Sequence, residues 1–195
     1  MCTNYENDAS PAAIADRFGL KDLPGLPPKA NLRPTDTGLV IGPGTTARVL
    51  RWGFIADWSK QPIVNARCET LAGKPTFEPA LENRCLVPAS AYFEWRHDGK
   101  NRLKNRISLP GGGLMAFAGL VFEDRFTIIT CQPTPALAHI HNRMPVILER
   151  RAEAHWIDPD AEFADVEKWL VPYAGDTLQA IEDTPPPDRQ ADLFA

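Results

Sequence analysis

Residues 85–110, CLVPASAYFEWRHDGKNRLKNRISLP, form the stretch that decides the fold class. An apolar, strand-like run leads to Asp98-Gly99, which is a strong hairpin signal, and a second strand-like run follows. Further along, three glycines at 111–113 precede LMAFAGLVF, and the short link EDR precedes FTIITC. Because consecutive strands are joined by tight turns, this region predicts an antiparallel meander rather than alternating strand–helix units.

The segments on either side predict short helices and further strands. SPAAIADRFGL predicts a helix that is capped by Ser10, has Pro11 in its first turn and ends at Gly19. We also expect short helices in FEPALENRC, TPALAHI, RRAEAHWI and DVEKWL, strands in ARVLRWGFI and MPVIL, and an extended loop in KDLPGLPPKANLRP. The predicted fold class is therefore α+β, with a mostly antiparallel, barrel-like β core and short peripheral helices.

The size and composition are those of an ordinary globular protein. A chain of 195 residues fits one domain, and 44% hydrophobic residues allow a buried core. We expect a single domain over residues 1–182 and a loose tail over 183–195, DTPPPDRQADLFA. No apolar run approaches the ~18 residues of a membrane span, and no signal-peptide pattern opens the chain. We expect a cytoplasmic monomer without membrane association.

The cysteines and histidines do not follow the spacing of a metal site or a disulfide framework. The cysteines are widely separated and form no CxxC pair, and the histidines do not join them at ligand spacing. We therefore expect no metal and no cofactor. The residues concerned are Cys2, Cys68, Cys85, Cys131, His97, His139, His141 and His155.

The charge is unevenly distributed along the chain, although the net value is only −4. Residues 48–106 contain eleven Lys/Arg and six Asp/Glu, whereas residues 145–195 contain four Lys/Arg and twelve Asp/Glu. A basic middle and an acidic end are compatible with one face that meets phosphates. Ordinary solvated surface charge explains the same pattern equally well.

Cys2, in the opening MCTNY, is the first candidate for chemistry. If Met1 is trimmed, as is usual before so small a residue, Cys2 carries a free α-amine and a thiol on adjacent carbons. Their ordinary pKa values, ~7.7–8.0 and ~8.5, leave both groups partly nucleophilic in the cell. Such an aminothiol condenses with an aldehyde to an imine, and the thiol then closes a five-membered thiazolidine ring. The alternative is a chance cysteine at an unremarkable terminus.

Two further residues have the character of proton-transfer groups. Glu94 lies in the aromatic run AYFEW, where desolvation would raise the pKa of a carboxyl toward neutrality and suit it to general acid–base work. The alternative is that Glu94 lies on the solvent-exposed face of the strand. His141, in IHNRMP just before a strand, can move protons at physiological pH or act as a hydrogen-bonded packing residue.

Polar and aromatic residues elsewhere fit a nucleic-acid surface. Asn65 in NARCET can orient a substrate, and Arg67 can bind a phosphate through two hydrogen bonds. A turn-forming Asn and a surface Arg are the alternative. Trp52 and Trp58, in RWGFIADW, can stack on the bases of a single strand or belong to the core.

The order of these segments is more specific than any one of them. MC at the start, then RWGFIADWSK, NARCET, RCLVPASAYFEW, AFAGL and IHNRMPVIL, together resemble the SOS-response-associated peptidase (SRAP) family over roughly residues 1–150. The resemblance implies a barrel-like α+β fold and a role in the DNA damage (SOS) response. It also implies that the protein shields abasic sites in single-stranded DNA by covalent linkage through Cys2.

The same resemblance assigns roles to the other residues. Asn65, Glu94 and His141 match the remaining catalytic positions of the family. The positions expected to contact DNA are Arg67, Arg143, Trp52, Arg51 and Arg84. The partner expected is single-stranded DNA with an abasic site, which would place the bound protein at the nucleoid. Weak lyase activity at the lesion is also expected.

The chain departs from the family pattern at three places. Thr3-Asn4-Tyr5 stands where Gly-Arg-Phe is common, Asn142 stands where an acidic residue is frequent, and Cys68, where Ser is common, is read as a tolerated small residue. Two other function classes compete with covalent linkage. One is a thiol peptidase or autopeptidase that uses Cys2 as its nucleophile, and the other is a DNA-binding module without chemistry.

Overall fold

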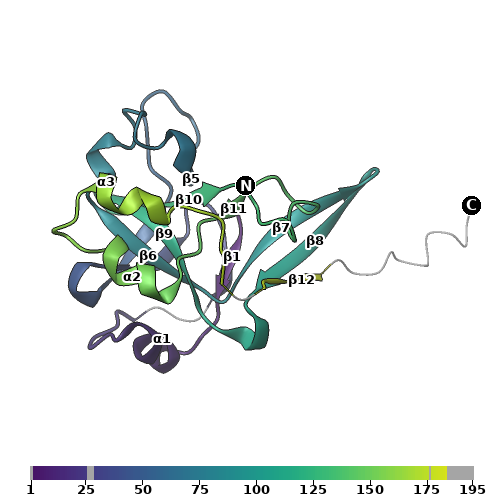
Figure 1. Cartoon of the computed structure of the whole chain (residues 1–195), viewed down its shortest axis with the longest axis horizontal. Coiled ribbons are helices and arrows are strands. Elements are labelled where there is room, and N and C mark those ends of the chain that lie inside the picture. Colours follow the sequence, from purple (N-terminus) through teal and green to yellow (C-terminus); the bar gives the residue numbers. More distant parts are fainter. Residues whose placement is uncertain (1, 26–28, 176, 184–195) are drawn as a thin grey trace, which may run out of the picture.

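The structure is a computed structural model that describes residues 2–25, 29–175 and 177–183. Within these residues, two β-sheets and three short α-helices form the molecule (Figure 1). The helices are α1 (Pro11–Phe18), α2 (Arg150–Trp156) and α3 (Phe163–Val166). The strands are β1 (Tyr5–Asn7), β2 (Lys29–Leu32), β3 (Thr37–Gly42), β4 (Thr46–Trp52), β5 (Asn65–Arg67), β6 (Arg84–Ala89), β7 (Ala91–Asp98), β8 (Asn101–Ser108), β9 (Met115–Phe122), β10 (Arg125–Cys131), β11 (Met144–Pro145) and β12 (Gln179–Glu182).

Five strands close into a small barrel. Around it the order is β10-β4-β3-β6-β9, and β9 pairs again with β10. All these pairings are antiparallel except that of β4 with β10, which is parallel and makes the barrel mixed. Beyond the end of β4, β5 takes the same edge of β10, with Ile128 opposite Asn65. The α+β class with a barrel-like, mostly antiparallel core is therefore confirmed.

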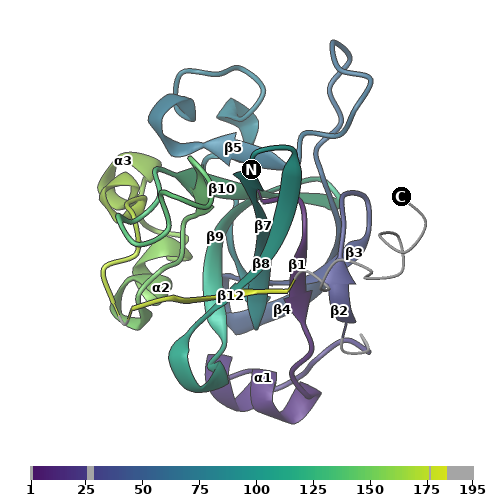
Figure 2. The ribbon, with the colours of Figure 1, turned by 90° about the vertical axis from the view of Figure 1, so that its right-hand side faces the viewer.

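The second sheet lies beside the barrel and has the order β12-β8-β7-β1-β2. Its centre is the hairpin of β7 and β8, which pairs from Tyr92–Ile107 out to Asp98–Asn101. The hairpin turns at Gly99, whose φ of 59° lies in the left-handed region that glycine adopts easily. Figure 1 shows this hairpin projecting from the barrel, and Figure 2 shows it in front of the barrel; β12 pairs with β8.

An aromatic cluster joins the N-terminal strand to the barrel. Tyr5 of β1 is buried, and its ring meets the ring of Trp52 edge-on at 5.1 Å and that of Phe117 at 6.0 Å. Trp52 stacks in turn on Phe126 at 6.2 Å. Gly38 on β3 leaves room for this arrangement, because an added Cβ there would lie 2.5 Å from the Tyr5 hydroxyl. The cluster therefore anchors Tyr5, the first residue of β1, against the barrel.

The predicted first helix is confirmed together with its caps. The Ser10 hydroxyl accepts a hydrogen bond from the Ala13 N–H at 3.2 Å, and Gly19 ends the helix with a φ of 65°. The helical predictions for RRAEAHWI and DVEKWL correspond to α2 and to α3 with the 3₁₀ turn that follows it. In FEPALENRC, only a single 3₁₀ turn forms, at Glu78–Ala80.

Several local predictions are wrong. The TPALAHI segment forms successive turns instead of a helix, because its hydrogen bonds alternate between i+3 and i+4 partners without forming a helical series. The meander is interrupted, since β6 pairs with β9 while the β7–β8 hairpin between them belongs to the other sheet. MPVIL contributes only the two-residue β11 and one bridge, from Ile147 to Phe117. The proline-rich segment expected to be a loop contains β2.

The predicted loose tail falls largely outside the described residues, which end at Asp183. Asp183 itself is held at the hairpin: its backbone N–H donates to the Lys104 carbonyl at 2.7 Å. Among the helices of the described part, none has the length and apolarity needed to cross a membrane.

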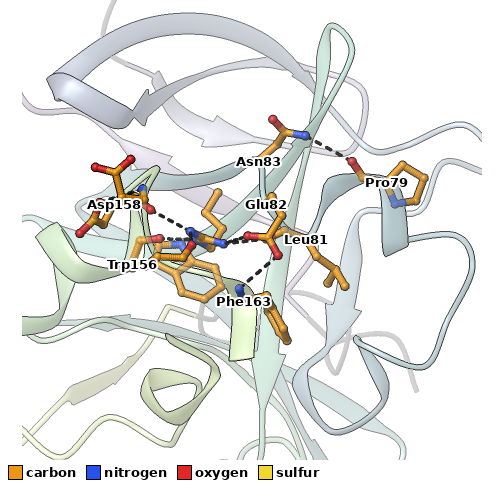
Figure 3. A network of polar contacts seen from close by, with 10 residues as sticks. Pro79, Leu81, Glu82, Asn83, Trp156, Asp158 and Phe163 are labelled. Carbon is orange, nitrogen blue, oxygen red and sulfur yellow. Dashed lines mark hydrogen bonds and ion pairs between the residues drawn. The ribbon is translucent and has the colours of Figure 1, made fainter. Parts of the chain in front are cut away.

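Arg84 acts as a clip between the barrel and the α2–α3 region. Its guanidinium donates to the carbonyls of Trp156 at 2.7 Å, Asp158 at 2.8 Å and Ala161. Glu82 supports the clip, because one of its oxygens pairs with Arg84 at 2.6 Å while the other accepts the Phe163 N–H at 3.1 Å (Figure 3). These bonds give the chain after α2 a fixed place on the barrel.

Candidate functional site

The site begins with Cys2, which lies three residues before β1 and is buried. Tyr5 pairs with Tyr92 on β7, so the residues just before β1 run alongside β7. Asn65, at the start of β5, donates from Nδ2 to the Cys2 carbonyl at 2.8 Å. A residue near a chain terminus, usually loose, is thus fixed between two strands.

Glu94 extends from β7 into the same region and is only 3% exposed. Desolvation by burial raises the pKa of its carboxyl to about 7, so both protonation states are populated at neutral pH. The prediction that Glu94 is buried is therefore favoured over the alternative that it lies on the solvent-exposed face of the strand. A carboxyl with a pKa near the working pH can both accept and return a proton.

His141 faces Glu94 from the loop before β11. Its Nε2 lies 3.8 Å from the Glu94 carboxylate, and its Nδ1 accepts the Arg143 backbone N–H at 3.0 Å. The Arg143 carbonyl lies 3.2 Å from the same nitrogen, so a ring with its proton on Nδ1 would donate to this carbonyl, and a ring with its proton on Nε2 would direct that proton toward Glu94. Burial lowers the pKa of His141, which favours the neutral form of the ring. Asn142 is exposed, and the backbone of Arg143 contacts the ring and helps to orient it.

The Cys2 thiol is protonated in this environment. Burial raises the pKa of the thiol, and the nearby Glu94 charge raises it further. Its Sγ donates weakly to the Asn4 carbonyl at 3.8 Å. Burial also raises the pKa of the Cys68 thiol, and the nearby Glu69 charge raises it further. This thiol is only partly buried. Neither thiol is a ready thiolate before a substrate arrives.

Arg143 is placed beside His141, but its guanidinium points inward. It forms a two-bonded ion pair with Glu69, at 2.6 and 2.9 Å, and also donates to the Thr130 carbonyl at 2.5 Å. The residue is 8% exposed. These contacts tie the loop carrying His141 to β10 and to the turn after β5, so Arg143 supports the site from behind.

The remaining predicted DNA-contacting residues divide by exposure. Trp52 is fully buried, with its Nε1 donating to the Val64 carbonyl at 2.9 Å, and Arg84 is buried in the clip. The structure therefore does not bring either side chain to the site surface. Arg67 and Arg51 are exposed, on β5 and β4, and Arg51 also donates to the Thr35 carbonyl at 3.2 Å.

Of the two tryptophans, Trp58 is the one whose side chain is exposed to a DNA strand, whereas Trp52 is buried. Trp58 lies between β4 and β5 and is 73% exposed, with Ile55 in the same loop 60% exposed. The sequence pattern offered both tryptophans, and only the structure separates the core residue from the exposed one. A large exposed aromatic side chain is the kind of group on which a base can stack.

No group of three or more potential ligands that could hold a metal ion occurs among the residues the structure describes. The carboxyl, imidazole and amide of the site instead converge on one cysteine close to the chain start. The fold and site thus define a class of proteins in which a small mixed barrel holds a cysteine from the start of the chain beside a buried carboxyl and an imidazole.

The comparisons with known proteins identify the family. The chain belongs to the SOS response associated peptidase (SRAP) family, whose model matches residues 1–183. It is 36% identical over 206 residues to abasic site processing protein YoaM of Bacillus subtilis, covering 93% of this chain and 90% of that protein. It is 30% identical over 116 residues to abasic site processing protein YedK of Escherichia coli, covering 54% of this chain and 52% of that protein.

Solved structures support the same fold. A crystal structure of a Bacteroides thetaiotaomicron protein aligns with a TM-score of 0.82 at 25% identity, covering 93% of this chain and 91% of that one. A Bordetella bronchiseptica protein gives a TM-score of 0.82 at 25% identity, covering 94% of this chain and all of that one.

Proposed function

We propose that this protein processes abasic sites in single-stranded DNA by linking itself to them through Cys2. The observation that carries the proposal is the convergence of Cys2, Asn65, Glu94 and His141, which come from four separate parts of the chain. The relatives named as abasic site processing proteins support it. Removal of Met1 is the required first step, because it creates the free α-amine.

The first chemical step is imine formation. An abasic site in its open form carries an aldehyde at C1′, and the Cys2 α-amine attacks that carbon. Asn65 fixes the Cys2 carbonyl, whose carbon is two bonds from the amine nitrogen, and so limits where the nucleophile can lie. Glu94 removes a proton from the amine and returns it to the departing hydroxyl, which leaves as water.

The second step converts the imine to a stable ring. The Cys2 sulfur bonds to C1′, the C=N double bond becomes single, and the thiol proton moves to nitrogen through Glu94. No oxidant is needed, and the overall reaction releases one water. The raised pKa of the thiol suits this order, because the sulfur stays protonated until the imine is present. In the tautomer that carries its proton on Nε2, His141 donates to the sugar oxygen and favours ring opening.

The DNA surface proposed for this reaction is formed by exposed side chains near β5. Arg67 lies two residues from Asn65, and Trp58 lies in the loop that leads to β5. Arg67 and Arg51 would contact phosphates, which position the strand without reading its sequence. Trp58 would stack on a base next to the lesion, a contact that tolerates any sequence.

A thiol peptidase that uses Cys2 as its nucleophile is less well supported by the site. Such an enzyme needs a thiolate, which usually arises from a depressed cysteine pKa. Burial and Glu94 act in the opposite direction on Cys2. Removal of the residue ahead of Cys2 remains part of the proposal. Weak strand cleavage through the imine is a side reaction of the same chemistry.

Replacing Cys2 by Ala tests the linkage, because it keeps an α-amine but removes the sulfur. Incubation with single-stranded DNA containing one abasic site should give the wild type a cross-link that survives denaturing gels without a reductant. The Cys2→Ala variant should give a cross-link only when borohydride traps the imine. A wild-type adduct that also needs borohydride, or a variant adduct that survives without it, would contradict thiazolidine formation.

A further inference from the structure

Arg96 lies on the same face of the β7–β8 hairpin as Glu94. Side chains of a strand alternate between its faces, so Tyr92, Glu94 and Arg96 point to one side. The register agrees, since Glu94 pairs with Asn105 and Arg96 with Leu103. Arg96 is two residues nearer the hairpin tip than Glu94, a separation of roughly 7 Å along an antiparallel strand. The Arg96 guanidinium therefore belongs to the face of β7 that carries Glu94 into the proposed reaction centre, two residues further along the strand.

A carboxylate from another strand pairs with this cation. Arg96 Nη2 lies 3.1 Å from Glu182 Oε2, at the end of β12, and the two side chains are 31% and 44% exposed. Guanidinium groups bind carboxylate and phosphate oxygens in similar geometry. Because both partners contact water, the attraction between them is small and easily exchanged. Glu182 thus occupies a place that a DNA phosphate oxygen could take.

We propose that Arg96 is a phosphate-binding residue for the DNA strand at the Cys2–Glu94 site, and that Glu182 competes with that phosphate. The proposal rests on the proposed function and extends it to a residue outside the set already assigned. DNA binding exchanges one ion pair for another, so no covalent bond changes. Glu182 then lowers the affinity for DNA, because the phosphate must displace its carboxylate from Arg96.

The opposite face of the same hairpin supplies a matched control. Lys104 pairs with Trp95 across the strands, so its side chain lies on the face away from Glu94. Its Nζ lies 3.0 Å from Asp183 Oδ2, and the two side chains are 31% and 54% exposed. Both ion pairs join the β12 end to the hairpin, with similar length and exposure. They differ in the face on which they lie.

The experiment measures binding of single-stranded DNA with a tetrahydrofuran abasic analogue, by fluorescence anisotropy over a range of salt concentrations. The analogue has no aldehyde, so binding is separated from linkage. Glu182→Gln should tighten binding about two- to five-fold, while Asp183→Asn, with the same change in net charge, should leave it unchanged. Arg96→Gln should weaken binding and reduce the slope of log K against log salt by about 0.7, while Lys104→Gln should not.

Equal effects of the two acidic substitutions would show a general charge effect and overturn the proposal, as would an unchanged affinity of Glu182→Gln. Loss of binding by the wild type to the analogue would also overturn it. The Arg96 proposal and the linkage proposal can fail separately. If the wild type forms no cross-link with natural abasic DNA but Glu182→Gln still binds the analogue more tightly, linkage fails and the phosphate contact stands.

Discussion

At the scale of single residues, we expect the Glu94 carboxyl to determine how the cross-linking reaction responds to pH. Its pKa of about 7, raised by burial, means that the basic form increases as pH rises through neutrality. The cross-linking rate of the wild type should therefore increase between about pH 6 and about pH 8. Part of this increase comes from the α-amine, whose ordinary pKa is ~7.7–8.0.

Glu94→Gln should slow cross-linking by about 10²-fold, because general acid–base catalysis typically contributes 10²–10⁴. The remaining pH dependence should follow the α-amine alone and shift to higher pH. Single-turnover rates on gels, measured for both proteins over this pH range, check the prediction. A variant that kept the wild-type rate and profile would exclude Glu94 from proton transfer.

The same substitution should stabilise the fold at high pH. Folded Glu94 holds its proton up to about pH 7, whereas an unfolded carboxyl loses it near its ordinary value of 4.5. The carboxyl therefore contributes stability at low pH that is lost as pH rises through this window. Because Gln stays neutral, Glu94→Gln should be more stable than the wild type at about pH 8, by on the order of 1–3 kcal/mol.

Urea unfolding at about pH 8 and about pH 4 measures this difference. The two proteins should have similar stability at the lower pH, where Glu94 is protonated in the folded chain and mostly protonated in the unfolded one. A variant less stable than the wild type at the higher pH would contradict this, because it would show that neighbouring groups stabilise the ionised Glu94 carboxylate and offset the cost of burying it.

At the scale of elements, the packing of β1 against the barrel affects the position of Cys2. Gly38→Ala would place a methyl carbon 2.5 Å from the Tyr5 hydroxyl, so Tyr5 and β1 must shift. We expect a loss of about 1–3 kcal/mol of stability from overpacking, together with slower cross-linking, because Cys2 lies three residues before Tyr5. Gly73→Ala is the control, since nothing lies within 4 Å of its added Cβ.

Unfolding and cross-linking rates of the two glycine variants together make the test. A Gly38→Ala protein that cross-links at the wild-type rate, at a temperature where it is fully folded, would show that Cys2 is positioned independently of Tyr5.

Local patterns in the sequence predicted some of these elements well and others poorly. The helix from Pro11 and the β7–β8 hairpin follow from Ser10, Gly19 and Asp98-Gly99, whose signals act within a few residues. The parallel pairing of β4 and β5 with β10 joins segments about 60 to 75 residues apart and leaves no local signal. The TPALAHI segment carried a local helical signal, yet it forms successive turns.

The candidate site shows the same division. Cys2, Asn65, Glu94 and His141 were named from motifs, and the structure brings them together. Motifs alone did not indicate which tryptophan was exposed or which arginines were buried. Burial depends on strands that are distant in the sequence, as in the stacking of Trp52 on Phe126 of β10.

At the scale of the whole molecule, the acidic C-terminal part packs through contacts with the basic middle. Arg84 provides one such contact by donating to the carbonyls of Trp156, Asp158 and Ala161. Arg84→Gln should destabilise the protein by roughly 2–4 kcal/mol, because buried carbonyls lose their donors. The salt dependence of DNA binding should not change.

Arg67→Gln should show the reverse pattern, since its side chain is exposed near the proposed strand path. Its stability should remain within about 0.5 kcal/mol of the wild type, while the salt slope should fall by about 0.7. Urea unfolding and anisotropy titrations of both variants separate the two roles. A lower salt slope for folded Arg84→Gln would return Arg84 to the DNA-binding set.

The linkage through Cys2 can be tested most directly by the intact mass of the protein before and after mixing with single-stranded DNA that contains one abasic site. We predict a starting mass that lacks one methionine, followed by a gain equal to the oligonucleotide minus one water. The gain should persist without reductant and be absent with undamaged DNA. A protein that has lost Met1 and binds the DNA, yet gains no mass, would contradict the proposed function.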